Sequence, residues 1–146
     1  MTAQAMTAQP ITAQTGAGRP EQDARQLLTG WQRGNVMAAD CPSRRILQHL
    51  TSRWGTLVMV ALAVHPHRFS ELRRAVGGVS ERMLSQTLKE LEADGLVLRT
   101  AHDVVPPHVD YRLTPLGVAA AGHLVPLIGW IEGSLPELLS ARPQEA

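Results

Sequence analysis

Two adjacent glycines between two helical segments constrain this chain more than any other feature. Residues 69–76 place apolar side chains on one side of a short helix, and Gly77-Gly78 then interrupts the pattern, since glycine adopts backbone conformations that other residues avoid. Ser80 is a favoured N-cap for a second helix over residues 81–93, and Gly95 suits the position just after its end. A short helix, a glycine turn and a longer helix are typical of a helix-turn-helix motif.

After this motif the side-chain pattern changes to a period of two. Residues 108–113 alternate apolar and polar side chains, as a half-buried strand does, and residues 96–102 are the expected partner strand. Residues 103–107 are the expected hairpin tip, because Pro106-Pro107 cannot sit inside a paired strand. A hairpin directly after the second helix is a wing, so the sequence predicts a winged helix-turn-helix.

Two helices are expected before the motif. Pro42 suits the first position of a helix that runs to about His49, where the missing N–H of proline costs nothing. Residues 54–64 are apolar on almost every side, which indicates a helix surrounded by other elements, and the loop His65-Pro66-His67 ends it. The side chains of the first helix that we expect to face inward are Ile46, Leu47 and Leu50.

A last helix is expected to begin at Pro115, with Thr114 as its cap. Its apolar side chains recur at three- and four-residue spacing and exceed what one small winged domain would cover. We therefore expect the chain to dimerise through its terminal helices, with packing inside one subunit as the alternative. The expected interface residues are Leu124, Leu127, Trp130 and Ile131, together with Leu27, Leu28 and Trp31.

The predicted fold class is mainly α with a small β-hairpin. Residues 1–20 repeat Thr-Ala-Gln and offer little to bury, so a disordered low-complexity tail is expected there. A short helix is expected within residues 21–36, the winged domain over residues 37–135, and a flexible C-terminal tail over residues 136–146.

The helix over residues 81–93 has two chemically different sides. At 100° per residue, its leucines share one narrow sector, and the opposite side presents two cations and an amide. Such groups contact base edges and phosphates in a major groove. Any amphipathic helix has a polar side, so the glycine turn and the wing carry much of this prediction. The leucines are Leu84, Leu88 and Leu91. The predicted DNA-binding residues are Ser80, Arg82, Met83, Ser85, Gln86 and Lys89, then Arg73 and Arg74 on the preceding helix, and Arg99 and His108 on the wing. For Arg99 the alternative is a cross-strand pair with Asp110.

The overall charge does not by itself indicate a nucleic-acid partner. The chain has 14 Lys and Arg against 13 Asp and Glu, a formal net charge of +1, so any basic surface must be local. The single cysteine excludes an internal disulfide and fits a reducing compartment. The N-terminus does not read as a secretory signal, and the longest uncharged apolar run, residues 54–64, is shorter than the roughly 20 residues of a membrane span. We expect a cytoplasmic protein without a membrane partner.

An enzyme is not expected. The sequence has no Gly-rich phosphate loop, carboxylate pair or nucleophile motif, so we predict neither catalytic residues nor a cofactor. We also predict no metal site, since His65 and His67 are typical of a plain loop, and Cys41, His49 and His123 would converge only through folding. Two alternatives stay open: a winged helix used for protein–protein contact, and a regulator that responds to a metal or small ligand.

Several short motifs follow one another in a specific order. They are Cys41-Pro42, Arg53-Trp54, Arg68-Phe69-Ser70-Glu71-Leu72, Ser80-Glu81-Arg82-Met83-Leu84, Leu88-Lys89-Glu90-Leu91, Asp94-Gly95-Leu96, Val105-Pro106-Pro107 and Tyr111-Arg112-Leu113-Thr114. Over about residues 41–130 the chain resembles the HxlR family of winged-helix regulators, which is related to the MarR group. The resemblance implies a bacterial homodimer on an inverted-repeat operator in double-stranded DNA, recognised by residues 80–89 and the wing, with repression expected by analogy.

The sequence departs from the family pattern at His108. The family commonly places an arginine or lysine there. A neutral imidazole is a poorer minor-groove anchor, which low pH would partly restore.

Cys41 precedes the first helix of the domain and is followed closely by Arg44 and Arg45. Helix N-terminal N–H groups and nearby cations favour the reactive thiolate. Several HxlR-like proteins sense oxidants or electrophiles through a cysteine here, so the resemblance makes Cys41 a redox-sensing candidate, with an electrophile, oxidant or other effector as partner. The alternative is that Cys41 is a small buried residue that fills the start of the helix.

Overall fold

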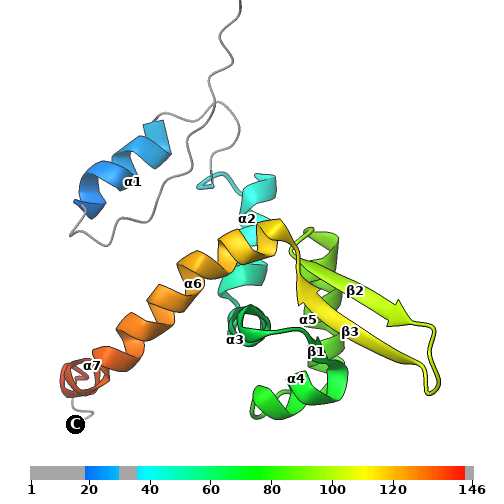
Figure 1. Ribbon diagram of the computed structural model, residues 1–146. Helices are drawn as coiled ribbons and strands as arrows, with labels where there is room; N and C mark the ends of the chain where they lie inside the picture. Colours follow the sequence, from blue (N-terminus) through cyan, green and yellow to red (C-terminus); the bar gives the residue numbers. More distant parts are fainter. Residues whose placement is uncertain (1–18, 30–35, 144–146) are drawn as a thin grey trace, which may run out of the picture. The chain divides into compact units, whose positions relative to one another are not determined.

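The computed structural model describes residues 19–29 and 36–143, and the chain divides into a unit of residues 1–35 and a unit of residues 36–146 (Figure 1). In the first unit, α1 (Pro20–Thr29) is a helix with no buried residue. This is the helix expected within residues 21–36. Leu27 and Leu28 are exposed on it. Trp31 and residues 1–18 of the tail predicted over residues 1–20 lie outside the described residues, and Pro20, expected in that tail, begins α1.

The second unit is a winged helix-turn-helix built around a small antiparallel sheet with the strand order β1-β3-β2. Its central helix, α3, contacts α2, α4, α5 and α6. The β2–β3 hairpin projects from one end of the unit, and α6 runs away from it toward α7 (Figure 1). The elements are α2 (Pro42–Thr51), α3 (Arg53–Val64), β1 (His67–Arg68), α4 (Phe69–Ala75), α5 (Glu81–Ala93), β2 (Val97–His102), β3 (His108–Leu113), α6 (Pro115–Gly133) and α7 (Leu135–Ser140).

Local capping sets the ends of these helices. The Ser80 hydroxyl accepts a hydrogen bond from the Met83 N–H at the start of α5, and the Thr114 hydroxyl accepts one from the Gly117 N–H at the start of α6. At the end of α5, Gly95 has φ +78°, and the next residue, Leu96, donates its N–H to Leu91 O. This is the Schellman arrangement, which favours glycine because of the positive φ. The caps expected at Ser80, Thr114 and Gly95 are therefore confirmed.

The hydrophobic core lies where α3, α4 and α5 meet the base of the hairpin. Val58 and Met59 of α3 and Leu72 of α4 are fully buried. Ile46 and Leu50 of α2 pack against this cluster, as predicted. The buried apolar residues are Val58, Met59, Leu62, Leu72, Val76, Val79, Leu84, Leu88, Leu91, Leu96, Val97 and Leu124, with Ala121 also buried on α6.

The structure differs from the sequence-based expectations on α2, at the loop after α3 and near the C-terminus. Leu47 was expected to face inward, but it is exposed on α2. The loop expected at residues 65–67 ends in strand β1, which pairs with β3 through His67–Tyr111 and Arg68–Asp110; a two-residue strand has too short a pattern to be recognised. Residues 135–140, expected near or within the flexible tail, form α7.

Helix α6 packs against α3 along one side and leaves most of its surface exposed. Gly117 packs closely against Leu96, the residue before β2. A Cβ atom added at Gly117 would be 2.0 Å from Leu96 O, so only glycine fits there. Beyond Ala121 and Leu124 the helix is mostly exposed, and only 17% of its apolar window is buried. By length and composition alone α6 is long and apolar enough to cross a membrane, so residues 115–133, and not residues 54–64 as expected, form the longest apolar helix described; one such helix is weak evidence for a membrane span. Leu124, expected at a subunit interface, is instead part of the subunit's own core.

We predict that Leu88→Ala destabilises the protein by about 2–5 kcal/mol, because Leu88 is 2% exposed and its truncation leaves a cavity between α5 and α3. The matched control is Met83→Ala on the same helix, where the side chain is 43% exposed and we expect a change within about 0.5 kcal/mol. Urea unfolding at one fixed protein concentration measures both. Equal midpoints for the two variants would contradict the packing described for α5.

Candidate nucleic-acid interface

Helix α5 presents a polar surface because its opposite side is fixed in the core. Leu84 and Leu91 are fully buried and Leu88 nearly so. Helical geometry therefore turns the other side of α5 to solvent. The side chains of Arg82, Met83, Gln86 and Lys89 are exposed there, Ser85 is half-buried beside them, and Ser80 lies exposed at the cap.

In the protein without DNA, two glutamates of α5 accept hydrogen bonds from side chains of this polar surface. Arg73 of α4 donates to Glu81 Oε1 at 2.9 Å, and Gln86 donates to Glu90 Oε1 at 3.0 Å. Both donors are thus oriented by acidic neighbours rather than extended into solvent. The Arg73–Glu81 pair is largely exposed, so its net contribution to stability is small, and a phosphate can compete for the arginine.

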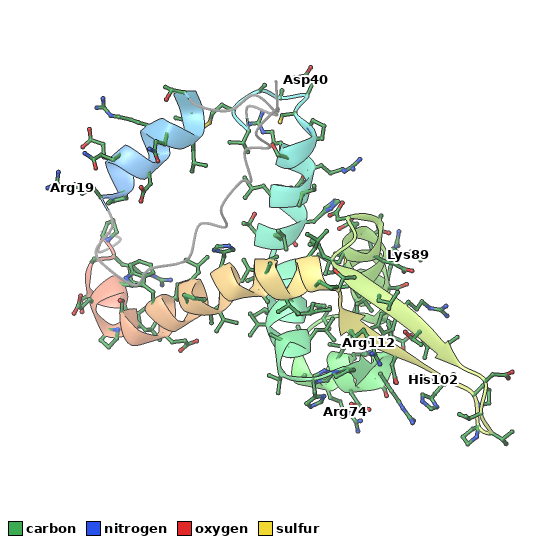
Figure 2. All side chains as sticks on the ribbon, turned by 45° about the horizontal axis from the view of Figure 1, so that its top comes forward. Arg19, Asp40, Arg74, Lys89, His102 and Arg112 are labelled. Atoms are coloured by element: carbon green, nitrogen blue, oxygen red, sulfur yellow. The ribbon has the colours of Figure 1, made fainter. Side chains whose placement is uncertain are left out.

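The turn between α4 and α5 is made by the predicted glycines. Gly78 has φ +86°, a conformation that favours glycine. Val76 and Val79 on either side are buried, which holds the turn against the core. Arg74, at the last turn of α4, is exposed close to the hairpin side of the unit (Figure 2).

A part-buried hydrogen bond between side chains attaches the end of α5 to α2. His49 Nδ1 of α2 lies 2.5 Å from Asp94 Oδ2 at the C-cap of α5, and the Asp94 side chain is only 1% exposed. Arg45 Nε lies 4.0 Å from the other carboxylate oxygen of Asp94, and His49 Nε2 lies 3.9 Å from Glu90 Oε2. Sequence reasoning missed this contact, since the two residues are 45 positions apart.

The side chains of the wing pair differently from the prediction. Arg99 faces Tyr111 across the hairpin and is exposed. Asp110 instead lies opposite Thr100, and its Oδ2 is 2.7 Å from His102 Nε2. The alternative pairing of Arg99 with Asp110 is therefore wrong. His108, expected as a DNA contact, is half-buried with its ring stacked on His102 at 4.5 Å between centroids.

The candidate surface joins α4, α5 and the hairpin. Helix α5 contacts β2, and α4 contacts β3. Lys89, Arg112, Arg74 and His102, from four different elements, lie toward the hairpin end of the unit (Figure 2). This end is opposite the far end of α6 (Figure 1). The geometry suits a duplex gripped by a helix and a wing.

Three further arginines lie on α2 and α3, and Arg53 of α3 contacts the neighbouring Trp54. Its guanidinium carbon lies 5.4 Å from the ring centroid of Trp54, a cation–π distance. Arg44 is exposed beside Cys41. Arg45 is exposed but leans toward Asp94.

Cys41 occupies the N-cap position of α2 and is half-buried. Its Sγ lies 2.8 Å from Ser43 Oγ. With Asp40, Arg44 and Arg45 it lines an open surface depression. Cys41 thus shares this depression with two arginines, and its role as a sensor stays a prediction.

A family model for the HxlR-like helix-turn-helix matches residues 49–138, which is more than half of the chain. The chain belongs to the HxlR-like helix-turn-helix family. The HTH-type transcriptional regulator YtfH of Escherichia coli is 55% identical over 113 residues, covering 77% of this chain and 90% of that protein. A solved structure of the transcriptional regulator YtfH from Salmonella typhimurium is 54% identical, with a TM-score of 0.69, and covers 73% of this chain and 96% of that one.

Membership of this family makes the chain a transcriptional regulator with a DNA-binding helix-turn-helix, and such HxlR-like proteins are generally not enzymes. Among solved structures, the redox regulator HypR in its reduced form is 32% identical with a TM-score of 0.62, covering 68% of this chain and 98% of that one. A diamide-treated form of YodB from B. subtilis is 30% identical with a TM-score of 0.56, covering 66% and 96%.

Proposed function

We propose that this HxlR-like protein is a cytoplasmic repressor that binds an inverted-repeat operator as a homodimer, with α5 in the major groove. The observation that supports this most directly is the two-sided burial of α5. Its leucines are held in the core while Arg82, Gln86 and Lys89 face solvent. Packing in the core explains the burial of the leucines by itself and leaves the polar side of α5 available to a partner.

The exposed side chains suit distinct parts of a duplex. Arg82 and Gln86 carry forked donors that match guanine and adenine edges, and Met83 offers apolar contact to a thymine methyl group. Lys89 suits a phosphate. Ser80 and Ser85 supply hydroxyl groups at the start of α5. Arg73 and Arg74 of α4 and Arg99 of the wing suit contacts with the DNA phosphate backbone.

The exposed apolar side of α6 supports a homodimer. Leu127 is 45% exposed and Trp130 is 59% exposed. They continue onto α7, which exposes Leu135, Leu138 and Leu139. Leu127 and Ile131 also border an apolar groove of about 300 Å³ between α6 and α3. A second copy that covers this surface would bury it and pair two α5 helices for grooves about 34 Å apart.

The position of Cys41 supports an oxidant or electrophile as the signal. Cys41 begins α2, and α2 holds Asp94 at the end of α5 through His49. Two Cys41 thiols of a dimer can pass two electrons and two protons to an oxidant such as diamide and form one disulfide. With a quinone, the sulfur bonds to a ring carbon and the thiol proton ends on a ring oxygen. Either change displaces the start of α2, and the His49–Asp94 contact carries the displacement to α5.

For the DNA interface, we predict that Arg82→Ala and Gln86→Ala each weaken operator binding by about 1–3 kcal/mol and relax base preference. Fluorescence anisotropy with DNA from upstream of the protein's own gene measures the affinity across a salt series. Arg82→Lys is the matched control: it keeps the charge but loses the planar fork, so it should lose base preference while keeping the salt dependence. Unchanged operator affinity in Arg82→Ala would rule out α5 as the reading helix.

For the dimer, we predict that Trp130→Glu yields a monomer, because it places a charge in the surface that a second copy covers. Sedimentation equilibrium measures the mass. Leu116→Glu is the control, since Leu116 is 67% exposed in the first turn of the same helix, and this variant should remain dimeric. A wild-type monomer at working concentration, or a dimeric Trp130→Glu, contradicts the proposed interface.

For the signal, we predict that diamide weakens operator binding of the wild-type protein about tenfold, a typical coupling between two sites. Cys41→Ser should keep its affinity under the same treatment, because the chain has no other thiol. The measurement is anisotropy before and after treatment, with a reducing agent added last to restore binding. If Cys41→Ser loses DNA as the wild type does, Cys41 is not the sensor.

A further inference from the structure

The hairpin register brings two histidines and a carboxylate together on the wing. His102 is the cross-strand partner of His108, and Asp110 follows His108 two residues later on β3, so it lies on the same side of the sheet. Asp110 Oδ2 lies 2.7 Å from His102 Nε2 and 3.9 Å from His108 Nε2. One ligand atom from each residue can be chosen so that all three lie within 4.8 Å of one another.

One atom of this cluster lacks a hydrogen-bond partner. Among the described residues, His102 Nε2 is the buried side-chain nitrogen that makes no hydrogen bond, although Asp110 Oδ2 is close. The two atoms are near each other but not aligned as donor and acceptor. A buried polar atom that lies close to a carboxylate without an aligned hydrogen bond needs an explanation. A cation bound by both atoms provides one.

The ring nitrogens of three other histidines have contacts of a different kind. His65 Nδ1 contacts Pro66 O and His67 Nδ1 contacts His65 O, each at 2.7 Å, and His49 is held by Asp94. The His65 and His67 rings also stack, but the contacts of this pair among the described residues include no carboxylate. The wing cluster alone meets the distance test for three metal ligands within the described part of the chain.

We propose that His102, His108 and Asp110 bind a divalent metal ion, with Zn²⁺ as the best match to two imidazole nitrogens and one carboxylate oxygen. Zinc bonds of about 2.0–2.2 Å in a tetrahedron place ligand atoms about 3.3–3.6 Å apart. The observed separations of 2.7 and 3.9 Å lie on either side of that range. Rotation of the two stacked imidazole rings completes the site, with water in the fourth position.

The ion changes the charge of the surface that faces DNA. Over residues 97–113, Arg99 and Arg112 balance Asp103 and Asp110 when the histidines are neutral. Bound Zn²⁺ adds two positive charges to this wing, which favours phosphate contact. This half of the inference rests on the proposed DNA-binding function. The metal thereby supplies the cationic wing that the side chains of His102 and His108 do not supply when neutral.

The first experiment measures metal binding without DNA. Cys41→Ser is the parent protein, so that the thiol cannot act as a ligand, and Co²⁺ is titrated as a spectroscopic probe and then displaced by Zn²⁺. We expect one ion per chain, with affinity at least tenfold lower in His102→Ala, His108→Ala and the near-isosteric Asp110→Asn. His123→Ala, an exposed histidine on α6, is the control and should bind as the parent does. No stoichiometric binding by the parent, or parental binding by His102→Ala, overturns the site; circular dichroism verifies that each variant is folded.

The second experiment measures operator affinity of the same proteins with Zn²⁺ and with a chelator. We expect Zn²⁺ to tighten binding by the parent about fivefold at ~0.15 M salt, roughly the gain of one phosphate contact, and to leave His102→Ala unchanged. An ion that binds without altering operator affinity overturns the charge coupling. If no protein binds DNA in either state, the proposed function fails, and the metal titration still decides the site.

Discussion

The burial of one side of α5 is the constraint on which the rest of this structure depends. Leu84, Leu88 and Leu91 pack into the core around Val58 and Met59 of α3. Because a helix repeats every 3.6 residues, fixing these leucines fixes the direction of every other side chain on α5. The Schellman turn at the end of α5 then starts β2 directly from the core, so the hairpin lies beside the exposed polar surface instead of elsewhere on the unit.

The same unit has two ends with different chemistry. The hairpin end carries cations from α4, α5 and the wing, while the far end of α6 and α7 exposes apolar side chains (Figures 1 and 2). Helix α2 connects the candidate sensor to the first of these ends, since it begins at Cys41 and its His49 holds Asp94. Under the proposed function, this arrangement assigns DNA contact, subunit contact and signal to different surfaces that share one core.

Short-range features were predictable from the sequence, and features that depend on contacts between distant segments were not. Ser80, Thr114 and Gly95 act as caps in the structure because a cap needs only its own neighbours. Leu47 has the spacing of an inward residue, yet the neighbouring elements leave it exposed. Leu124 has the spacing of an interface residue, yet α3 and the hairpin base cover it. Strand β1 exists only because β3 pairs with it.

The sequence alone predicted the helix-turn-helix, the hairpin with its proline tip, the two-sided character of α5 and the resemblance to the HxlR family. These features were predictable because periodicity, caps and turn residues act over a few positions. The tertiary structure decided which polar groups meet. His49 reaches Asp94 across 45 positions, and the strand register, not the spacing of His102, His108 and Asp110 along the chain, brings these three together. Such pairings depend on how whole elements pack, which no local pattern encodes.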